Sequence, residues 1–216
     1  MSSLIEIYRQ HQGSFERYQS LLLKWNEKIN LTAITDPKEI LDKHFFDSLA
    51  LLPALSDWLP NVSRETFLPE ALSLFVLDIG SGAGLPGIPL KIAAPPIKLT
   101  LVDTVKKKCD FLKEVVRVLG FESVQVLHQT LTGQCIGSYD LILTRATFNL
   151  KDYLELATPN LKPNGRIVAM KGPESAEEIK DSQIALNRLG LRPWEGVSYE
   201  LPLSRASRQL LMTRFP

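Results

Sequence analysis

The sequence predicts an α/β protein in which helices flank a mostly parallel β-sheet that ends in an antiparallel hairpin, preceded by a helical extension. Three observations predict this fold. An apolar run at residues 74–79 breaks into a glycine-rich turn, strand-like and helix-like segments alternate over residues 74–190, and two strand-like runs follow at the end of the chain. Such alternation is typical of βαβ units, which form parallel sheets covered by helices.

The glycine-rich turn predicts a ligand site. It directly follows the apolar run and contains Gly80, Gly82, Gly84 and Gly87. Glycines permit backbone angles and close approaches that a side chain would block. Ligands of open α/β sheets bind at the carboxyl ends of the strands, where this turn lies. A tight turn without a ligand is the alternative, but it leaves the matching strand end at Asp103 unexplained.

The charges beside the turn favour S-adenosylmethionine as the ligand. The spacing from Gly82 to Gly87 also fits the dinucleotide pattern G-x-G-x-x-G, with Asp103 about twenty residues further on as a ribose-binding carboxylate. Asp78, however, puts a negative charge where a pyrophosphate would bind the helix N-terminus. S-adenosylmethionine has no phosphate; it carries an ammonium and a sulfonium, and its ribose hydroxyls suit Asp103.

Residues 1–73 are expected to form a helical extension packed on the core. In its first part, apolar side chains recur at three- and four-residue steps, which predicts one amphipathic helix that ends before Asn30. These side chains are Phe15, Tyr18, Leu21, Leu22, Trp25 and Ile29.

A second helix is expected to begin after Asp36. Asp36 is a good N-cap, Pro37 suits the first helical position, and Glu39 can complete a capping box. This helix is predicted to run to about Pro53. Residues 56–72 are then expected to connect it to the first strand.

Residues 74–216 are expected to form the cofactor-binding domain. Short apolar runs predict its strands, and helical spacing of apolar side chains predicts its helices. The predicted strands span residues 74–79, 98–102, 124–127, 139–144 and 166–170, with a hairpin formed by 196–201 and 209–215. The predicted helices span residues 87–94, 105–119, 150–160 and 176–189; Gly120 and Gly190 are expected to end the second and the fourth.

Composition fits a cytosolic protein with one core. The chain has 216 residues, of which 44% are hydrophobic, and no stretch approaches a membrane span. The N-terminus lacks the basic-then-apolar order of a signal peptide, and Cys109 and Cys135 have no paired spacing for a disulfide or a metal. No coiled-coil pattern appears, so a monomer is expected. The formal charge of +1 does not indicate a nucleic-acid binder, so any basic surface must be local.

Six short blocks resemble one protein family. They are Asn-Leu-Thr-Ala-Ile-Thr-Asp-Pro at residues 30–37, His-Phe-Phe-Asp-Ser-Leu at 44–49, the turn from Asp78 to Leu90, Leu-Val-Asp at 101–103, Thr-Arg-Ala at 144–146 and Met-Lys-Gly at 170–172. Together they resemble the bacterial small-subunit (16S) ribosomal RNA guanine-N7 methyltransferases, also called the glucose-inhibited division protein B family. The resemblance covers about residues 24–171. It is specific, because the two N-terminal blocks and the Gly-Leu-Pro-Gly-Ile-Pro turn are not general features of methyltransferases.

The resemblance implies a class I methyltransferase fold with a Rossmann-like sheet. It also implies S-adenosylmethionine as the methyl donor and small-subunit ribosomal RNA, or the assembling subunit, as the partner. The residues that it places against the cofactor are Gly80, Leu85, Asp103, Thr130, Leu131 and Arg145. The family often has an acidic residue in the loop after the third strand. Here that loop reads Gln-Thr-Leu-Thr at residues 129–132, so backbone contacts are expected to replace a carboxylate.

Methyl transfer to guanine N7 requires no proton transfer by the protein. N7 has an in-plane lone pair that carries no proton, so it attacks the sulfonium methyl group without a general base. Catalysis then depends on positioning and electrostatics, with water excluded. The candidate catalytic residues are Arg145, Lys171 and Asp47. Arg145 follows the fourth strand and is suited to bind a phosphate, stack on a base or hold the cofactor carboxylate.

The other charged candidates each have two interpretations. Lys171, after the fifth strand, contacts a phosphate or the guanine O6, or is a solvated lysine. Asp47 stabilises the transition state or ties the helical extension to the core. His44 is expected to be a hydrogen-bonded structural histidine. The lysines at residues 106–108 form a solvated helix face or contact the RNA backbone.

Three other functions remain open on the sequence. A methyltransferase of a small molecule or protein would share the cofactor site but have no use for basic residues on its rim. A dinucleotide oxidoreductase is disfavoured by Asp78. A non-catalytic RNA-binding protein that retains the cofactor would bind it without methyl transfer.

Overall fold

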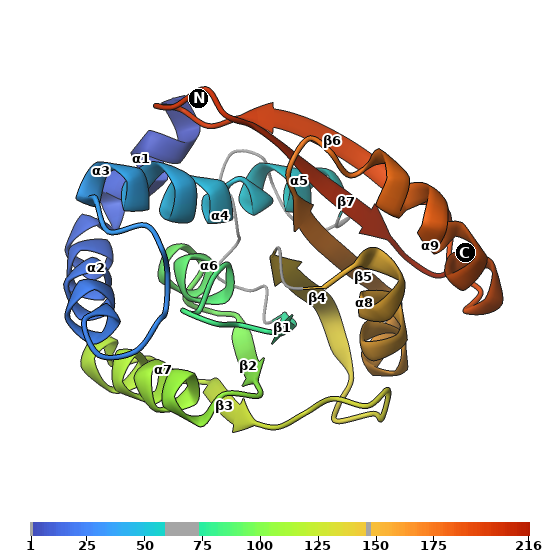
Figure 1. The fold of residues 1–216 in the computed structure, drawn as a ribbon, viewed down its shortest axis with the longest axis horizontal. Coiled ribbons are helices and arrows are strands. Elements are labelled where there is room, and N and C mark those ends of the chain that lie inside the picture. The colour runs from blue at the N-terminus through green and yellow to red at the C-terminus, as the bar shows by residue number, and fades with distance from the viewer. Residues whose placement is uncertain (1, 59–73, 146–147) are drawn as a thin grey trace.

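A computed structural model describes residues 2–58, 74–145 and 148–216. Seven strands form a single sheet in it: β1 (Phe75–Ile79), β2 (Lys98–Asp103), β3 (Val124–His128), β4 (Tyr139–Arg145), β5 (Leu161–Lys171), β6 (Glu195–Glu200) and β7 (Ser207–Thr213). Their order is β3-β2-β1-β4-β5-β7-β6 (Figure 1). The first five strands are parallel, and β7 runs antiparallel to both β5 and β6. The predicted parallel sheet with a C-terminal antiparallel hairpin is confirmed.

Helices connect the parallel strands much as predicted: α6 (Gly87–Ala93), α7 (Lys106–Leu119), α8 (Leu150–Ala157) followed by the short 3-10 helix η2 (Thr158–Asn160), and α9 (Ala176–Arg188). One strand boundary differs. β5 begins at Leu161 instead of Arg166, because Leu161 pairs with Tyr139 ahead of an irregularity in the β4–β5 register. Pro163 and Gly165 lie within this irregular part and resemble a turn in the sequence.

The helical extension has more elements than predicted. A first helix, α1 (Ser2–Gln10), precedes α2 (Gln12–Asn26), so two helices replace the single one expected, and Ile29 lies beyond the end of α2. The Asp36 cap is confirmed, since its carboxylate accepts the N–H groups of Lys38 and Glu39 at 2.9 Å. The carboxylate of Glu39 pairs with Lys43 in the next turn.

The helical segment after Asp36 continues past Pro53 and contains a π-helix in its middle. It consists of α3 (Pro37–Ile40), the π-helix η1 (Leu41–Phe46), α4 (Asp47–Leu49) and α5 (Leu51–Trp58). π-helical turns are rare and frequently occur at functional sites. Here the π-helix contains His44 and precedes Asp47. Most of the predicted connection at residues 56–72 lies outside the described residues.

The extension packs on one face of the sheet. One hydrophobic cluster joins Phe15 and Leu22 of α2 to Val76 and Leu101 of the sheet, and α6 and α7 belong to the same side. α8 and α9 cover the other face, where Leu77 and Ile142 lie (Figure 1). The proposed domain boundary at residue 73 falls outside the described residues and stays a prediction. In the described part of the chain, no helix is both long and apolar enough to cross a membrane.

Candidate cofactor and acceptor site

The glycine-rich turn joins β1 to α6 at the carboxyl edge of the sheet. Its start is held to β2, because the N–H groups of Gly80 and Ser81 both donate to the carbonyl of Val102, at 2.9 and 3.0 Å. Gly84 has a φ of +89°, and a Cβ there would lie 2.6 Å from Ile88 and 2.9 Å from Leu112. Only glycine fits this position, so the turn packs closely onto α6 and α7.

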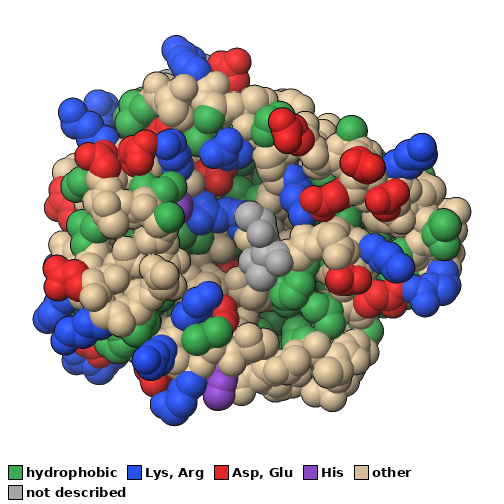
Figure 2. All heavy atoms as spheres, in the orientation of Figure 1, with side chains coloured by type: hydrophobic (Ala, Val, Ile, Leu, Met, Phe, Trp, Pro, Cys, Tyr) green, Lys and Arg blue, Asp and Glu red, His purple; other side chains and the backbone are tan. Residues whose placement is uncertain are grey.

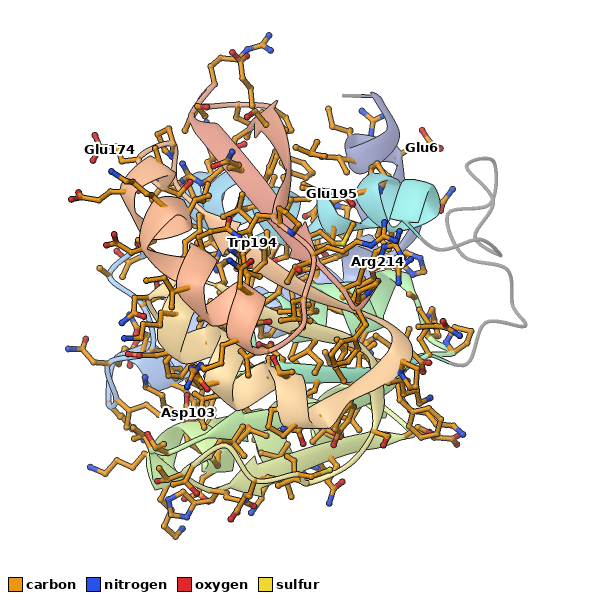
Figure 3. All side chains as sticks on the ribbon, turned by 90° about the vertical axis from the view of Figure 1, so that its right-hand side faces the viewer. Glu6, Asp103, Glu174, Trp194, Glu195 and Arg214 are labelled. Carbon is orange, nitrogen blue, oxygen red and sulfur yellow. The ribbon has the colours of Figure 1, made fainter. Side chains whose placement is uncertain are left out.

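Asp103 ends β2 and faces the same turn. Its carboxylate accepts the N–H of Gly82 and the N–H of Val105, both at 2.8 Å. The residue is 6% exposed, and it lines the hollows at the sheet edge. In Figure 3, Asp103 and Glu174 lie toward one edge of the molecule, and Arg214, after β7, lies toward the opposite edge.

Two adjoining hollows open beside Asp103. The apolar hollow, of about 220 Å³, is lined by side chains that include Val105, Leu131, Phe148 and Leu156. The polar hollow, of about 210 Å³, is lined by the turn at residues 80–83 and by Leu85, Thr32, His44 and Arg145. Gly80, Asp103 and Lys108 line both hollows. Together they fit a long ligand with a flat apolar ring at one end and charged groups at the other.

Most of the predicted cofactor residues meet at one place, with two exceptions. Thr130 and Leu131 line the apolar hollow, and Gly80, Gly82, Leu85, Asp103 and Arg145 line the polar one. Gly84 lines neither hollow and packs against α6 and α7. Asp78, which the sequence places beside the ligand, is fully buried beneath the turn instead. One of its oxygens, Oδ2, accepts the N–H of Gly87 at the start of α6, at 2.9 Å.

The other carboxylate oxygen of Asp78 indicates which kind of ligand the turn can bind. Oδ1 is buried and has no hydrogen-bond partner among the described residues. Burial is the main cause that raises the pKa of Asp78 to about 7, with a smaller effect in the opposite direction from the Gly87 N–H. A buried carboxylate beneath the turn favours a ligand with a positive charge and disfavours a pyrophosphate. The site therefore fits S-adenosylmethionine.

Arg145 is held by the helical extension. Its Nη1 donates to the carbonyl of Lys43 at 3.0 Å and to Asp47 Oδ2 at 3.3 Å, and its Nη2 lies 3.2 Å from His44 Nδ1. Nδ1 of His44 also lies 3.1 Å from the Lys43 carbonyl, and its Nε2 lies 2.8 Å from Thr32 Oγ1. Burial and then Arg145 lower the pKa of His44 to about 4, so its imidazole is neutral at pH 7.

Asp47 joins three parts of the fold. Besides Arg145 of β4, it accepts the hydroxyl of Tyr199 from β6 at 2.7 Å and lies 3.6 Å from Nε of Arg208 in β7. Its side chain is buried. Nearby, Asp42 accepts the N–H groups of Leu203 and Ser204 in the hairpin loop, both at 2.9 Å. The structure thus places Asp47 where it ties the extension to the core.

A third, basic hollow of about 430 Å³ lies on the other side of Arg145. Its charged and polar lining residues are Lys43, His44, Asp47, Arg145, Lys171 and Arg208. Arg145 and His44 also line the polar hollow, so this pair separates the two spaces. Lysines and arginines surround the hollowed centre of this face in Figure 2, whereas acidic side chains gather on the side of α9.

Lys171 and the lysines of α7 differ in their exposure and in their contacts. The Lys171 ammonium donates to the carbonyl of Phe148 at 2.6 Å and pairs with Glu178 at 2.7 Å, so it is pinned to the protein and 10% exposed. Lys106 is exposed and pairs with Asp110, whereas Lys108 reaches the rim of the cofactor hollows.

Sequence reasoning missed several residues of the site. Lys43 and Arg208 line the basic hollow, and Thr32 lines the polar one. The block at residues 30–37 was a signal for Thr32, because it carries part of the family resemblance, but Arg208 lies in the distant hairpin, where no local pattern marks it.

Comparison with known proteins agrees with this geometry. A family model described as GidB, rRNA small subunit methyltransferase G, matches residues 11–200. The ribosomal RNA small subunit methyltransferase G of Myxococcus xanthus is 41% identical over 199 residues, covering 90% of this chain and 84% of that protein. The protein of the same name from Geobacter sp. (strain M21) is 40% identical over 202 residues, covering 92% and 86%.

Solved structures share the fold at low sequence identity. A ribosomal protein L11 methylase from Lactobacillus delbrueckii subsp. bulgaricus matches with a TM-score of 0.57 and 15% identity, over 86% of this chain and 90% of that one. A SAM dependent methyltransferase from Aquifex aeolicus matches with a TM-score of 0.54 and 20% identity, over 82% and 93%. The family model and the close relatives cover most of this chain, which therefore belongs to the GidB family, rRNA small subunit methyltransferase G.

Proposed function

We propose that this protein transfers a methyl group from S-adenosylmethionine to N7 of a guanosine in 16S ribosomal RNA, acting in the cytoplasm as a monomer. The observation that carries the proposal is the arrangement of the hollows. A cofactor-sized space built on the glycine-rich turn adjoins a basic hollow, and Arg145 and His44 separate them. Family membership supports the same reaction.

The chain's own residues provide a place for each part of the cofactor. The apolar hollow would hold the adenine against Val105, Leu131 and Phe148, and backbone groups at Thr130 would serve where the family often has a carboxylate. Asp103 would accept the ribose hydroxyls. The turn and Arg145 would hold the amino acid end in the polar hollow. When bound, S-adenosylmethionine supplies an electrophilic methyl group on a sulfonium.

The basic hollow receives the target guanosine and its phosphate. Arg208 and Lys43 supply positive charge for the phosphate, and Lys171 supports the loop that contains Phe148. The position of Arg145, fixed by Asp47, sets the boundary at which the base edge meets the cofactor. A small molecule would not need this rim of cations, which favours RNA over the other acceptors.

The protonation states in the site suit a reaction without a general base. N7 of guanine attacks through a lone pair and releases no proton. Neutral His44 places no positive charge near the boundary, and Arg145 is partly neutralised by Asp47. The guanine becomes cationic as the methyl group is transferred, so a full unpaired cation against N7 would oppose the reaction. The residues therefore act by holding the two reactants in line.

A comparison of acceptors tests the proposed function. The protein is incubated with methyl-labelled S-adenosylmethionine and with small ribosomal subunits, naked small-subunit RNA, large subunits or transfer RNA, each lacking N7-methylguanosine. Label in the small subunit or its RNA alone is expected. Cofactor binding without labelling of any acceptor favours a non-catalytic protein, and labelling of small molecules or proteins in a cell extract favours another methyltransferase class.

A further inference from the structure

Tyr18 links the helical extension directly to the glycine-rich turn. This side chain of α2 is fully buried, and its hydroxyl donates to the carbonyl of Ala83, between Gly82 and Gly84, at 2.5 Å. The ring stacks on Phe45 of the π-helix, with centroids 5.5 Å apart and an angle of 24° between the planes. A buried tyrosine in this position is held by packing, so its hydroxyl has a fixed direction.

The Ala83 carbonyl belongs to the part of the turn that shapes the polar hollow. Ala83 lines that hollow and is itself buried. A buried carbonyl needs a donor, and losing one costs the free energy of desolvating the group. Burial is the main cause that raises the pKa of Tyr18, so the hydroxyl stays protonated and remains a donor at every physiological pH.

Other parts of the extension meet the same hollow. Leu31, Thr32 and His44 line it opposite the turn. Gly84 is also close to Tyr18, since a Cβ on Gly84 would lie 3.3 Å from the Tyr18 hydroxyl oxygen. The turn is thus enclosed between the sheet, α7 and the extension, and its conformation depends on all three.

We infer that Tyr18 is a positioning residue for cofactor binding, whose hydroxyl holds the Ala83 peptide so that the turn keeps the shape that S-adenosylmethionine requires. This inference rests on the proposed function, because it takes S-adenosylmethionine as the ligand of the turn. It assigns to the helical extension a role in cofactor affinity in addition to contacts with RNA.

The test removes only the hydroxyl. In Tyr18→Phe, the dissociation constant for S-adenosylhomocysteine, measured by titration calorimetry, is expected to rise about fivefold to tenfold, as for loss of one buried hydrogen bond. Tyr153→Phe is the matched control: Tyr153 is equally buried, and its hydroxyl donates to the carbonyls of Ile142 and Val168 at 2.9 and 3.0 Å. The control is expected to lose stability but to keep the dissociation constant of the unchanged protein.

A second comparison separates positioning from general loosening of the helix. Leu22→Ala removes buried packing from α2 and keeps the Tyr18 hydroxyl. It is expected to keep the affinity, which ligand-induced shifts of the melting temperature report even in a marginally stable variant. An unchanged dissociation constant in Tyr18→Phe overturns the inference. A loss of affinity in Tyr153→Phe or Leu22→Ala as large as in Tyr18→Phe also overturns it. Failure of the unchanged protein to bind S-adenosylhomocysteine contradicts the proposed function itself.

Discussion

Arg145 and Asp47, which are 98 residues apart in the sequence, form an ion pair with an N–O distance of 3.3 Å between the end of β4 and the helical extension. Arg145 lines both the polar hollow and the basic hollow, and Asp47 lines the basic one. The ion pair therefore fixes the position of the guanidinium at the boundary between the two spaces, by a contact made outside the sheet.

Replacing Arg145 by lysine is expected to lower kcat/KM for methyl transfer by about 10- to 100-fold. Lysine retains the charge but cannot contact the Lys43 carbonyl, His44 and Asp47 together, and small displacements at a reacting centre cost rate of this order. Initial rates with small ribosomal subunits measure the effect. Arg117→Lys on α7, where the arginine is exposed and pairs with Glu114, is the control and is expected to keep the full rate.

Asp47→Asn is expected to destabilise the fold by about 2–4 kcal/mol, because it removes a buried negative charge from between Arg145 and Arg208. Urea unfolding followed by circular dichroism measures the free energy of unfolding. Asp140→Asn breaks the more exposed pair with Lys162 and is expected to cost less than about 1 kcal/mol. Equal losses in both variants would show that Asp47 has no special role in joining the extension to the core.

The affinity for S-adenosylmethionine is expected to rise as the pH increases through about 7. The pKa of Asp78 is raised to about 7, mainly by burial, and its ionised form attracts the cationic cofactor more strongly than the protonated form. Titration calorimetry between pH 6 and 8 follows the change, and Asp78→Asn is expected to bind more weakly with a flatter pH dependence.

The same raised pKa makes the stability of the free protein change in the opposite direction with pH. The folded state keeps a proton on Asp78 at pH values where the unfolded chain, with a pKa of 3.8, has lost it. This group therefore contributes stability that is complete below pH 3.8 and is lost as the pH rises through about 7. A cofactor affinity that falls from pH 6 to 8 would exclude the attraction between ionised Asp78 and the cationic cofactor.

Neutralising the first lysines of α7 is expected to weaken the binding of RNA but not the binding of the cofactor. Lys106→Gln combined with Lys107→Gln removes two exposed charges beside the site, so the KM for small subunits is expected to rise about threefold to tenfold at moderate salt. The dissociation constant for S-adenosylhomocysteine is expected to stay unchanged. Lys151→Gln with Lys180→Gln, on α8 and α9, removes two exposed charges from the side with many acidic residues and serves as the control.

The sequence was most informative where local chemistry decides the structure. Apolar runs located the parallel strands, and the Asp36 cap located the start of a helix. The glycines and Asp103 located the candidate cofactor site, because a turn at a strand end needs these residue types at short spacing. The early start of β5 was not predictable, since Pro163 and Gly165 resemble a turn and the pairing of Leu161 with Tyr139 decides otherwise.

Contacts over long sequence separations explain most of what was missed. Tyr199 and Asp47 are 152 residues apart, and Tyr18 and Ala83 are 65 apart. No local pattern encodes such pairs, because they form only when the extension and the hairpin pack on the finished sheet. The π-helix also had no signal of its own in the sequence, since its residues fit an ordinary amphipathic helix.

The most direct measurement identifies the methylated nucleoside. Small subunits that lack N7-methylguanosine are labelled with S-adenosylmethionine, and their RNA is digested to nucleosides and separated by chromatography. We expect the label in N7-methylguanosine and its loss when Asp103→Ala replaces the unchanged protein. Label in a different nucleoside, or full labelling by Asp103→Ala, would contradict the proposed reaction or the proposed cofactor site, respectively.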